Sequence, residues 1–311
     1  MHILVTGASG FVGSHLVPHL NRTFTEALVT GIGGPPDRGG IDIADYESVA
    51  TTIRRHKPDI IIHLAALSAV SESLLAPEAA YRINLGGTLN ILRAISEESP
   101  LSALIFASTS EVYGRSFRSG EALDETAQLA PMNPYAVSKA AADLAVQEAA
   151  NRKVRATILR LFNHIGPGQS TAFALPSFAR QIAEIELRKK PPILLTGNLS
   201  AYRDFLDISD VLNAYTSVVE NIHQLNQCEI FNISSGVPRK ISDLLNYLLS
   251  LSNVEIKIDT DPNRLRPSDI QQAIGNATQA EDRLGWQPER PVEYTLKSIL
   301  EHERIEARKL S

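Results

Sequence analysis

The chain opens with MHILVTGASGFVG, residues 1–13, in which an apolar run leads into three glycines spaced three residues apart. Residues 2–6 have the pattern of a buried strand, and residues 11–20 that of a short helix. Small residues at a strand-to-helix turn let the backbone approach a pyrophosphate, and the helix N-terminus adds amides and a favourable dipole. Such spacing alone marks only a tight turn, but its position here predicts nucleotide binding.

The same alternation of strand and helix continues through the first half of the chain. Apolar runs lie at 27–31, 59–66, 101–108 and 154–162, and helical patterns lie at 46–56, 78–98 and 134–151. Strands that are apolar on both faces and separated by helices indicate a parallel sheet covered on both sides. We therefore predict a doubly wound α/β fold, of the Rossmann type.

The second half is less regular and predicts a smaller α/β domain. Helical patterns lie at 173–189, 208–222 and 241–251, and short strands at 191–197, 201–207 and 228–234. We predict a dinucleotide-binding domain over 1–163 with a return segment at about 200–234, and a substrate domain over 164–199 and 235–311.

Composition excludes several classes of protein. A net charge of −5 argues against a nucleic-acid binder, which would need a basic face. No apolar run is long enough to span a membrane, and no basic, cleavable segment precedes the first strand. The eight histidines show no ligand spacing, so no metal is expected. With Cys228 as the only cysteine, we expect a cytoplasmic protein.

The predicted second strand ends in LVTGIGG, residues 28–34, without the acidic residue that would bind the adenosine ribose of NAD. A carboxylate there would repel a 2′-phosphate, so its absence favours NADP(H), with NAD(H) as the alternative. Arg38 is a candidate partner for that phosphate or an ordinary loop charge. Asp42 lies too far along for the ribose and is assigned to the adenine instead.

NPYAVSK, residues 133–139, places Tyr135 and Lys139 four residues apart behind a proline that suits the first helical turn. The two side chains then share one face of the helix. An ammonium near a phenol favours the phenolate, so we expect Lys139 to lower the pKa of Tyr135 and make it an acid or base near neutrality.

STSEVYG, residues 108–114, follows the apolar run LSALIFA and leaves two reactions open. The hydroxyl of Thr109 could share a carbonyl oxygen with Tyr135, which suits a reductase. Thr109 with Glu111 two residues on suits a dehydratase equally well, because a carboxylate could remove a proton. This stretch alone does not decide between them.

TGASGFVG, HLAA, STSEVYG and PYAVSK in this order resemble the extended short-chain dehydrogenase/reductase family of nucleotide-sugar enzymes. The similarity continues through RDFLDISD (203–210), NRLRPSDI (263–270) and LGWQPE (284–289), and it is most specific over 160–186 and 197–205. Those segments are most similar to the enzymes that reduce GDP-4-dehydro-6-deoxy-D-mannose. The resemblance implies NAD(P)H-dependent reduction of that sugar's C4 ketone to GDP-D-rhamnose.

The resemblance also assigns residues by position. The cofactor would be held by Gly7, Gly10, Phe11, Val12, Gly13, Asp42, Ile43, Leu64, Ala65, Ala66, Tyr135 and Lys139. The catalytic set would be Thr109, Tyr135 and Lys139, with Glu111 as an accessory or a dehydratase base. The GDP-linked keto-deoxysugar would be bound by Ser68, Thr109, Asn163, Gln169, Arg203 and Arg266. Guanidinium groups suit diphosphate oxygens.

Two departures from the family's GDP-mannose 4,6-dehydratases favour the reductase. Those enzymes carry an arginine pair soon after the motif FNH, whereas no charged residue lies between His164 and Arg180 here. They also carry basic residues after the second strand, where this chain has GIGGPPDRGG. Another epimerase or reductase of the family, a product of the GDP-6-deoxy-D-talose type, and a catalytically silent NADP-binding protein remain alternatives.

The helices predicted at 78–98 and 134–151 are rich in alanine and leucine, more than one buried face requires. In the family such helices pair across a two-fold axis, so the resemblance implies a homodimer.

Overall fold

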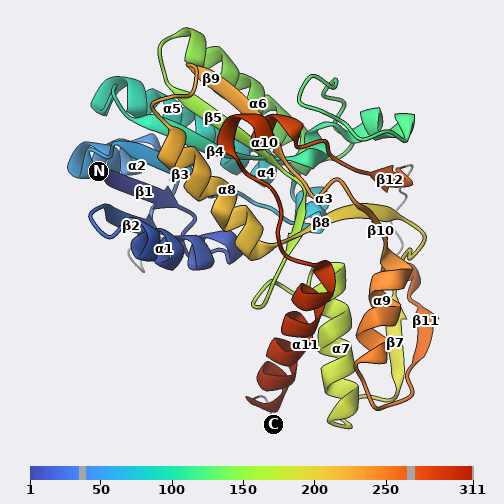
Figure 1. The fold of residues 1–311 in the computed structure, drawn as a ribbon. Coiled ribbons are helices and arrows are strands. Elements are labelled where there is room, and N and C mark those ends of the chain that lie inside the picture. Colours follow the sequence, from blue (N-terminus) through green and yellow to red (C-terminus); the bar gives the residue numbers. More distant parts are fainter. Residues whose placement is uncertain (35–39, 265–269, 310–311) are drawn as a thin grey trace.

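The computed structural model describes residues 1–34, 40–264 and 270–309, and its centre is a sheet of six parallel strands (Figure 1). The strands are β1 (His2–Thr6), β2 (Leu28–Ile32), β3 (Ile60–His63), β4 (Ala103–Thr109), β5 (Ala156–Leu161) and β9 (Cys228–Ile233). Their order in the sheet is β2-β1-β3-β4-β5-β9. The order reverses between β1 and β3, and ligands of such sheets bind outside the carboxyl ends of the strands at that switch point.

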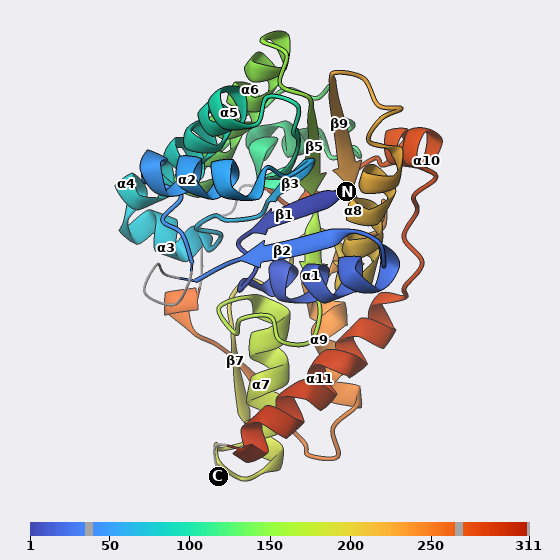
Figure 2. The ribbon, with the colours of Figure 1, turned by 90° about the vertical axis from the view of Figure 1, so that its left-hand side faces the viewer.

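Helices cover both faces of this sheet (Figure 2). One face carries α2 (Tyr46–His56), α5 (Gly87–Glu98) and α6 (Pro134–Asn151), and the other carries α1 (Phe11–Thr23), α8 (Ile208–Asn221) and α10 (Thr278–Leu284). Successive strand residues alternate between the two cores: Leu4 packs under α2 and α5, whereas Ile3 and Val5 pack under α1 and α8. The predicted doubly wound α/β fold is confirmed.

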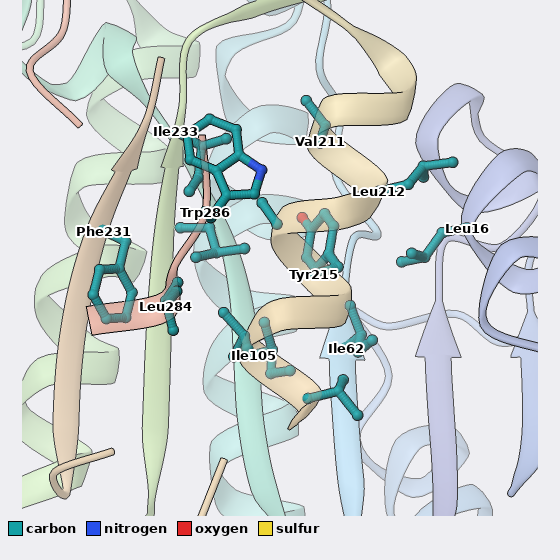
Figure 3. Close-up of a cluster of buried hydrophobic side chains, with 14 of the residues drawn as sticks. Leu16, Ile62, Ile105, Val211, Leu212, Tyr215, Phe231, Ile233, Leu284 and Trp286 are labelled. Carbon is teal, nitrogen blue, oxygen red and sulfur yellow. The ribbon is translucent and has the colours of Figure 1, made fainter. Parts of the chain in front are cut away.

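The core on the face covered by α1, α8 and α10 contains mainly apolar side chains, many of them between α8 and the sheet (Figure 3). Tyr215 and Trp286 are its largest polar-tipped members, and both are almost fully buried. The indole Nε1 of Trp286 donates to the backbone oxygen of Asp210 at 2.9 Å. Because Trp286 follows α10, this contact attaches the late part of the chain to α8, which packs on the sheet.

A separate cluster of helices and strands lies beyond the carboxyl ends of the sheet (Figure 1). Its helices are α7 (Ala174–Glu186), α9 (Ile241–Ser250) and α11 (Val292–Lys309), packed on the parallel pair β7 (Ile193–Thr196) and β11 (Lys257–Thr260). Between this cluster and the sheet lie β6 (Asn163–Ile165), β8 (Tyr202–Asp207), β10 (Pro238–Lys240) and β12 (Gln272–Ala273). The return of β9 to the main sheet follows the expected path, although the proposed domain limits stay a prediction.

The helix predicted over 78–98 is composed of three pieces. These are the short helix α4 (Pro77–Ala80), a π-helical turn, Tyr81–Gly86, and α5; another short helix, α3 (Val70–Leu75), precedes them. Such turns bulge one residue out of the helical register and often occur at functional sites. Here the bulge directs the side chain of Asn84 inward, where it is 1% exposed. None of the described helices has an apolar stretch long enough to cross a membrane.

Candidate active site

The glycine-rich turn connects β1 to α1 at the switch point of the sheet. Gly7 has φ +71°, and a Cβ on it would lie 2.6 Å from the backbone nitrogen of Ala65. A Cβ on Gly13 would lie 2.3 Å from the oxygen of Gly7. The turn therefore packs directly on its own helix and on the segment after β3. Gly10 caps α1 without a side-chain hydrogen bond, which leaves first-turn amides for a phosphate.

A cavity of about 270 Å³ lies beside this turn. Five predicted cofactor residues line it, namely Gly7, Asp42, Ile43, Ala65 and Ala66. The sequence reasoning missed its other lining residues, which are Ile32, Gly33, Gly34, Ile41, Leu67 and Ile83. Leu64, Gly10, Phe11, Val12 and Gly13 lie outside this lining. A slot at the switch point with mostly apolar walls fits the adenosine half of a dinucleotide.

Gly33, the residue after β2, has no room for a side chain beside this cavity. A Cβ on Gly33 would lie 2.2 Å from the backbone nitrogen of Ser9, so a ribose-binding carboxylate cannot be placed there without moving the glycine-rich turn. Asp42 Oδ1 accepts a hydrogen bond from the backbone nitrogen of Ala44 at 2.9 Å, and its Oδ2 lies 3.9 Å from Arg82. Arg38 lies outside the described residues.

Tyr135 and Thr109 meet at the carboxyl end of β4. Asn133 caps α6 by accepting from the backbone nitrogen of Ala136 at 2.8 Å, and Pro134 occupies the first helical position. This start places Tyr135 in the first turn of α6, where its hydroxyl interacts with the side chain of Thr109 and the interaction lowers the pKa of the phenol. Thr109 Oγ1 also accepts from the backbone nitrogen of Glu111 at 3.3 Å. Two of the predicted catalytic residues are therefore in contact.

The expectation that Lys139 lowers the pKa of Tyr135 is wrong for this structure. Burial raises the pKa of Tyr135 to about 12, the bond from Thr109 opposes the rise, and the charge of Glu111 adds to it. The ammonium of Lys139 donates instead to the backbone oxygen of Ala107 and lies 4.2 Å from the centroid of the Phe106 ring. Loss of hydration thus favours the neutral phenol, which is the form that gives a proton.

Lys139 itself is 4% exposed, and burial lowers its pKa to about 7 against the opposing charge of Asp143. Burial, with Lys139 nearby, lowers the pKa of His63 to about 3, so this imidazole is neutral. His63 Nδ1 lies 2.8 Å from Thr6 Oγ1 and its Nε2 3.3 Å from Thr88 Oγ1. The part of the site around Lys139 and His63 is therefore fully buried.

Glu111 lies close enough to Tyr135 and to Arg203 for its charge to affect the pKa of each. Its Oε2 accepts from Asn133 Nδ2 at 3.2 Å, and its charge opposes the burial that lowers the pKa of Arg203. Arg203 on β8 donates to the backbone oxygen of Tyr202 at 2.7 Å, and no salt bridge involves it among the described residues. The structure thus places a carboxylate between the phenol and a half-buried guanidinium.

The other predicted substrate residues are more scattered. Asn163 donates to the backbone oxygen of Asp204 at 3.3 Å, beside Arg203. Gln169 Nε2 donates to the backbone oxygen of His164 at 3.0 Å, while its buried Oε1 has no partner among the described residues. Ser68 is exposed, and Arg266 lies outside the described residues.

Two supporting contacts were missed from the sequence. The ring of His164 stacks on Phe11 of the glycine-rich turn at 6.2 Å, which joins β6 to the cofactor side. Asn84 accepts from the backbone nitrogen of Leu67 at 2.8 Å and donates to Leu67 O and Ser138 Oγ. Only the glycines of NLGGT, after Asn84, marked this stretch in the sequence. Over the described ranges, no cluster of histidine, cysteine and acidic side chains could hold a metal ion.

The parallel sheet, the glycine-rich turn at its switch point and the Thr109, Tyr135 and Lys139 cluster define an extended short-chain dehydrogenase/reductase. Comparison with known proteins specifies the family. The family model for GDP-mannose 4,6 dehydratase matches residues 39–299, and the chain belongs to this family. It is thus an NAD(P)-dependent oxidoreductase of the nucleotide-sugar class.

Individual relatives fall within the same class. GDP-6-deoxy-D-mannose reductase of Pseudomonas aeruginosa is 34% identical over 299 residues, which cover 96% of this chain and 95% of the relative. GDP-6-deoxy-D-talose 4-dehydrogenase of Aggregatibacter actinomycetemcomitans is 31% identical and covers 92% of each chain. The solved structure of RMD from Pseudomonas aeruginosa complexed with NADPH is 33% identical, with a TM-score of 0.87 over 98% of this chain and 99% of that one.

Proposed function

We propose that the protein reduces the C4 ketone of GDP-4-dehydro-6-deoxy-D-mannose with NADPH and gives GDP-D-rhamnose. Similarity to a GDP-6-deoxy-D-mannose reductase along almost the whole chain supports the substrate. The observation that carries the direction of the reaction is the half-buried phenol of Tyr135 beside Thr109, which desolvation keeps neutral. A reductase needs a proton donor at this position.

Bound NADPH would supply the hydride to C4. Tyr135 gives its proton to the developing alkoxide, and Thr109 hydrogen-bonds the same oxygen. Each placed donor stabilises the alkoxide by roughly 3 kcal/mol in a dry site. Lys139, at the floor of the site, is in place to hold the ribose next to the nicotinamide. The described residues fit these roles without a metal ion.

The same residues argue against a dehydratase. The first charged residue after His164 is Arg180 on α7, and its Nε lies 2.8 Å from Glu303 of α11. That guanidinium therefore joins two helices of the outer cluster and does not replace the arginine pair of the dehydratases. Glu111 remains as an accessory that orients Asn133, and through it the start of α6.

Arg203 and Asn163 are proposed to bind the diphosphate of the sugar nucleotide, together with Arg266. Arg203 is half-buried next to the catalytic cluster, and within the described part of the chain its guanidinium bonds only to the backbone oxygens of Tyr202 and Ile270. Arg203→Lys should raise KM about tenfold with little change in kcat, because a point charge loses the bidentate contact. Arg239→Lys on the neighbouring strand, whose partner is Glu293, is the control.

NADPH is the proposed cofactor, because the sequence has no acidic residue at the end of β2 and Ser9 leaves no space for one at Gly33. We also propose a homodimer, formed through α5 and α6, where Leu89, Val137 and Leu144 are 47%, 37% and 55% exposed. Light scattering of the purified protein would test this assembly. The cytoplasm is the proposed setting, as the composition suggests.

The first experiment is NADPH oxidation by the purified protein with freshly made GDP-4-dehydro-6-deoxy-D-mannose, with NADH in a parallel assay. Fast loss of reduced-cofactor absorbance, and a rhamnose product by NMR, would support the proposal and rank the cofactors. A product with the talose configuration at C4 would change the proposed product but not the proposed ketone reduction, and it would agree with the similarity to GDP-6-deoxy-D-talose 4-dehydrogenase. Absence of oxidation, with water elimination from GDP-mannose and NADP⁺, would refute the reductase.

A further inference from the structure

A row of contacts connects α6 to the end of β4. Three residues of α6 spaced four apart face three consecutive residues of β4. Lys139 donates to Ala107 O, Asp143 accepts from Ser108 Oγ at 2.6 Å, and the phenol of Tyr135 interacts with the side chain of Thr109. The strand β3 ends opposite Phe106, so β4 has no strand partner on that side beyond this point. The row therefore fixes the register between α6 and the catalytic end of the strand.

Asp143 is the innermost member of this row and has no role in the proposed chemistry. It is fully buried, and Oδ2 accepts from Ser108 Oγ and from Arg160 Nε at 3.1 Å. Oδ1 accepts from Arg160 Nη2 at 3.1 Å and from Gln147 at 2.7 Å. Arg160 belongs to β5, the next strand of the sheet, and is 2% exposed. The carboxylate thus joins α6 to two neighbouring strands.

A buried ion pair of this kind needs an explanation other than stability. Two charges lose their hydration on burial, and well-packed apolar residues often stabilise a core as well as such a pair does. What the pair supplies is a directional contact, because the guanidinium donates one hydrogen bond to each of the two carboxylate oxygens. A turn or a slide of α6 on the sheet would break it, and Lys139 and Tyr135 would move with the same helix.

We propose that Asp143, fixed by Ser108 and Arg160, is a positioning residue that sets the register of α6 and thereby places Lys139 and Tyr135. The proposal rests on the reductase function for the roles of those two residues. Asp143 touches neither substrate nor cofactor. Its contribution is the placement of the lysine one turn away and the phenol two turns away.

Four variants separate placement from folding. Asp143→Asn leaves Arg160 without a counter-charge and should lower both the melting temperature and kcat/KM. The double variant Asp143→Asn with Arg160→Met removes the isolated charge and should regain much of the melting temperature, yet keep a loss of kcat/KM of about 10- to 100-fold. Ser108→Ala removes one bond without exposing a charge and should cost a few-fold in rate. Asp210→Asn, a buried carboxylate under the opposite face, should alter melting but not the rate.

NADPH titration, followed by its fluorescence, gives a readout that needs no sugar. Asp143→Asn should weaken NADPH binding several-fold in the native protein but less than about twofold in a Lys139→Met background, because the effect passes through that lysine. Failure of the wild-type protein to reduce the keto-sugar would refute the proposed function alone. Two results would overturn the positioning role. One is that the double variant regains its rate and NADPH affinity along with its melting temperature. The other is that Asp143→Asn weakens NADPH binding equally with and without Lys139→Met.

Discussion

The two faces of the six-stranded sheet are built differently. Under α5 and α6 lie many buried polar side chains, all hydrogen-bonded: His63, Asn84, Thr88, Ser108, Ser138, Lys139 and Asp143. Under α8 the core is nearly apolar, and the hydroxyl of Tyr215 has no partner among the described residues (Figure 3). Directional bonds fix atoms in one arrangement, whereas apolar burial stabilises without direction. We therefore expect the first face to govern chemistry and the second to govern stability.

The largest effect should come from the polar face. Tyr135→Phe removes the proton donor and should lower kcat for keto-sugar reduction about 10³-fold. The melting temperature should change little, because the ring and its packing remain. Steady-state kinetics of both proteins would measure this, with Tyr294→Phe on the exposed face of α11 as the control. Full turnover by Tyr135→Phe would show that the protein works by another donor.

The apolar face should show the reverse behaviour. Leu212→Ala on α8 removes a buried side chain and should reduce the free energy of unfolding by roughly 2–5 kcal/mol. The kcat of the protein that remains folded at 25 °C should stay within about twofold, since Leu212 belongs to the apolar core and has no proposed role in the reaction. Urea denaturation and kinetics on the same preparation test both parts. A large fall in the kcat of fully folded Leu212→Ala would show that the apolar face also governs the chemistry.

A smaller change should appear at the edge of the polar face. Glu111→Gln removes a charge that raises the pKa of Tyr135, so that pKa should fall. Reduction uses the protonated phenol, and its rate declines as pH rises through this pKa. The alkaline limb of the kcat profile should therefore move to lower pH, with kcat at neutral pH reduced only a few-fold.

Lys139, whose pKa is about 7, is the internal control for the Glu111→Gln variant, because any change in kcat with pH near 7 would come from this lysine. Its pKa is set by burial and by Asp143, and Glu111 is not among the causes. It should stay in place in Glu111→Gln. An alkaline limb that stays fixed or moves upward would contradict the assigned electrostatics, and total loss of activity would make Glu111 a catalytic residue.

The sequence was informative wherever a pattern is local. The apolar strands, the glycine-rich turn and the spacing of Tyr135 and Lys139 predicted the sheet and the meeting of Thr109 with the phenol. Contacts between distant elements could not be predicted: nothing at Asp143 or Arg160 reveals their pairing, and an i→i+5 turn such as that at Asn84 leaves no periodic pattern. The pKa of Tyr135 was predicted in the wrong direction because burial, which the sequence does not show, outweighs a nearby charge.

The smallest effect is expected at Tyr215, and it is the sharpest test of the contrast between the faces. Two tyrosines, Tyr113 and Tyr215, are fully buried in different cores, and their hydroxyls differ in hydrogen bonding. The Tyr113 hydroxyl donates to Asn232 Oδ1 at 2.7 Å and accepts from Arg160 Nη1 at 3.1 Å. The buried Tyr215 hydroxyl, among the described residues, has neither kind of bond.

Removing an unbonded buried hydroxyl relieves the cost of its desolvation, while the ring keeps its packing. Tyr215→Phe should therefore leave the free energy of unfolding unchanged or raise it by at most about 1 kcal/mol. Tyr113→Phe should lower it by roughly 1–3 kcal/mol, because Asn232 and Arg160 each lose a partner. Urea denaturation with equal m values gives both numbers. Equal destabilisation by the two substitutions would mean that the apolar face also depends on a directional bond, made by Tyr215 to an ordered water.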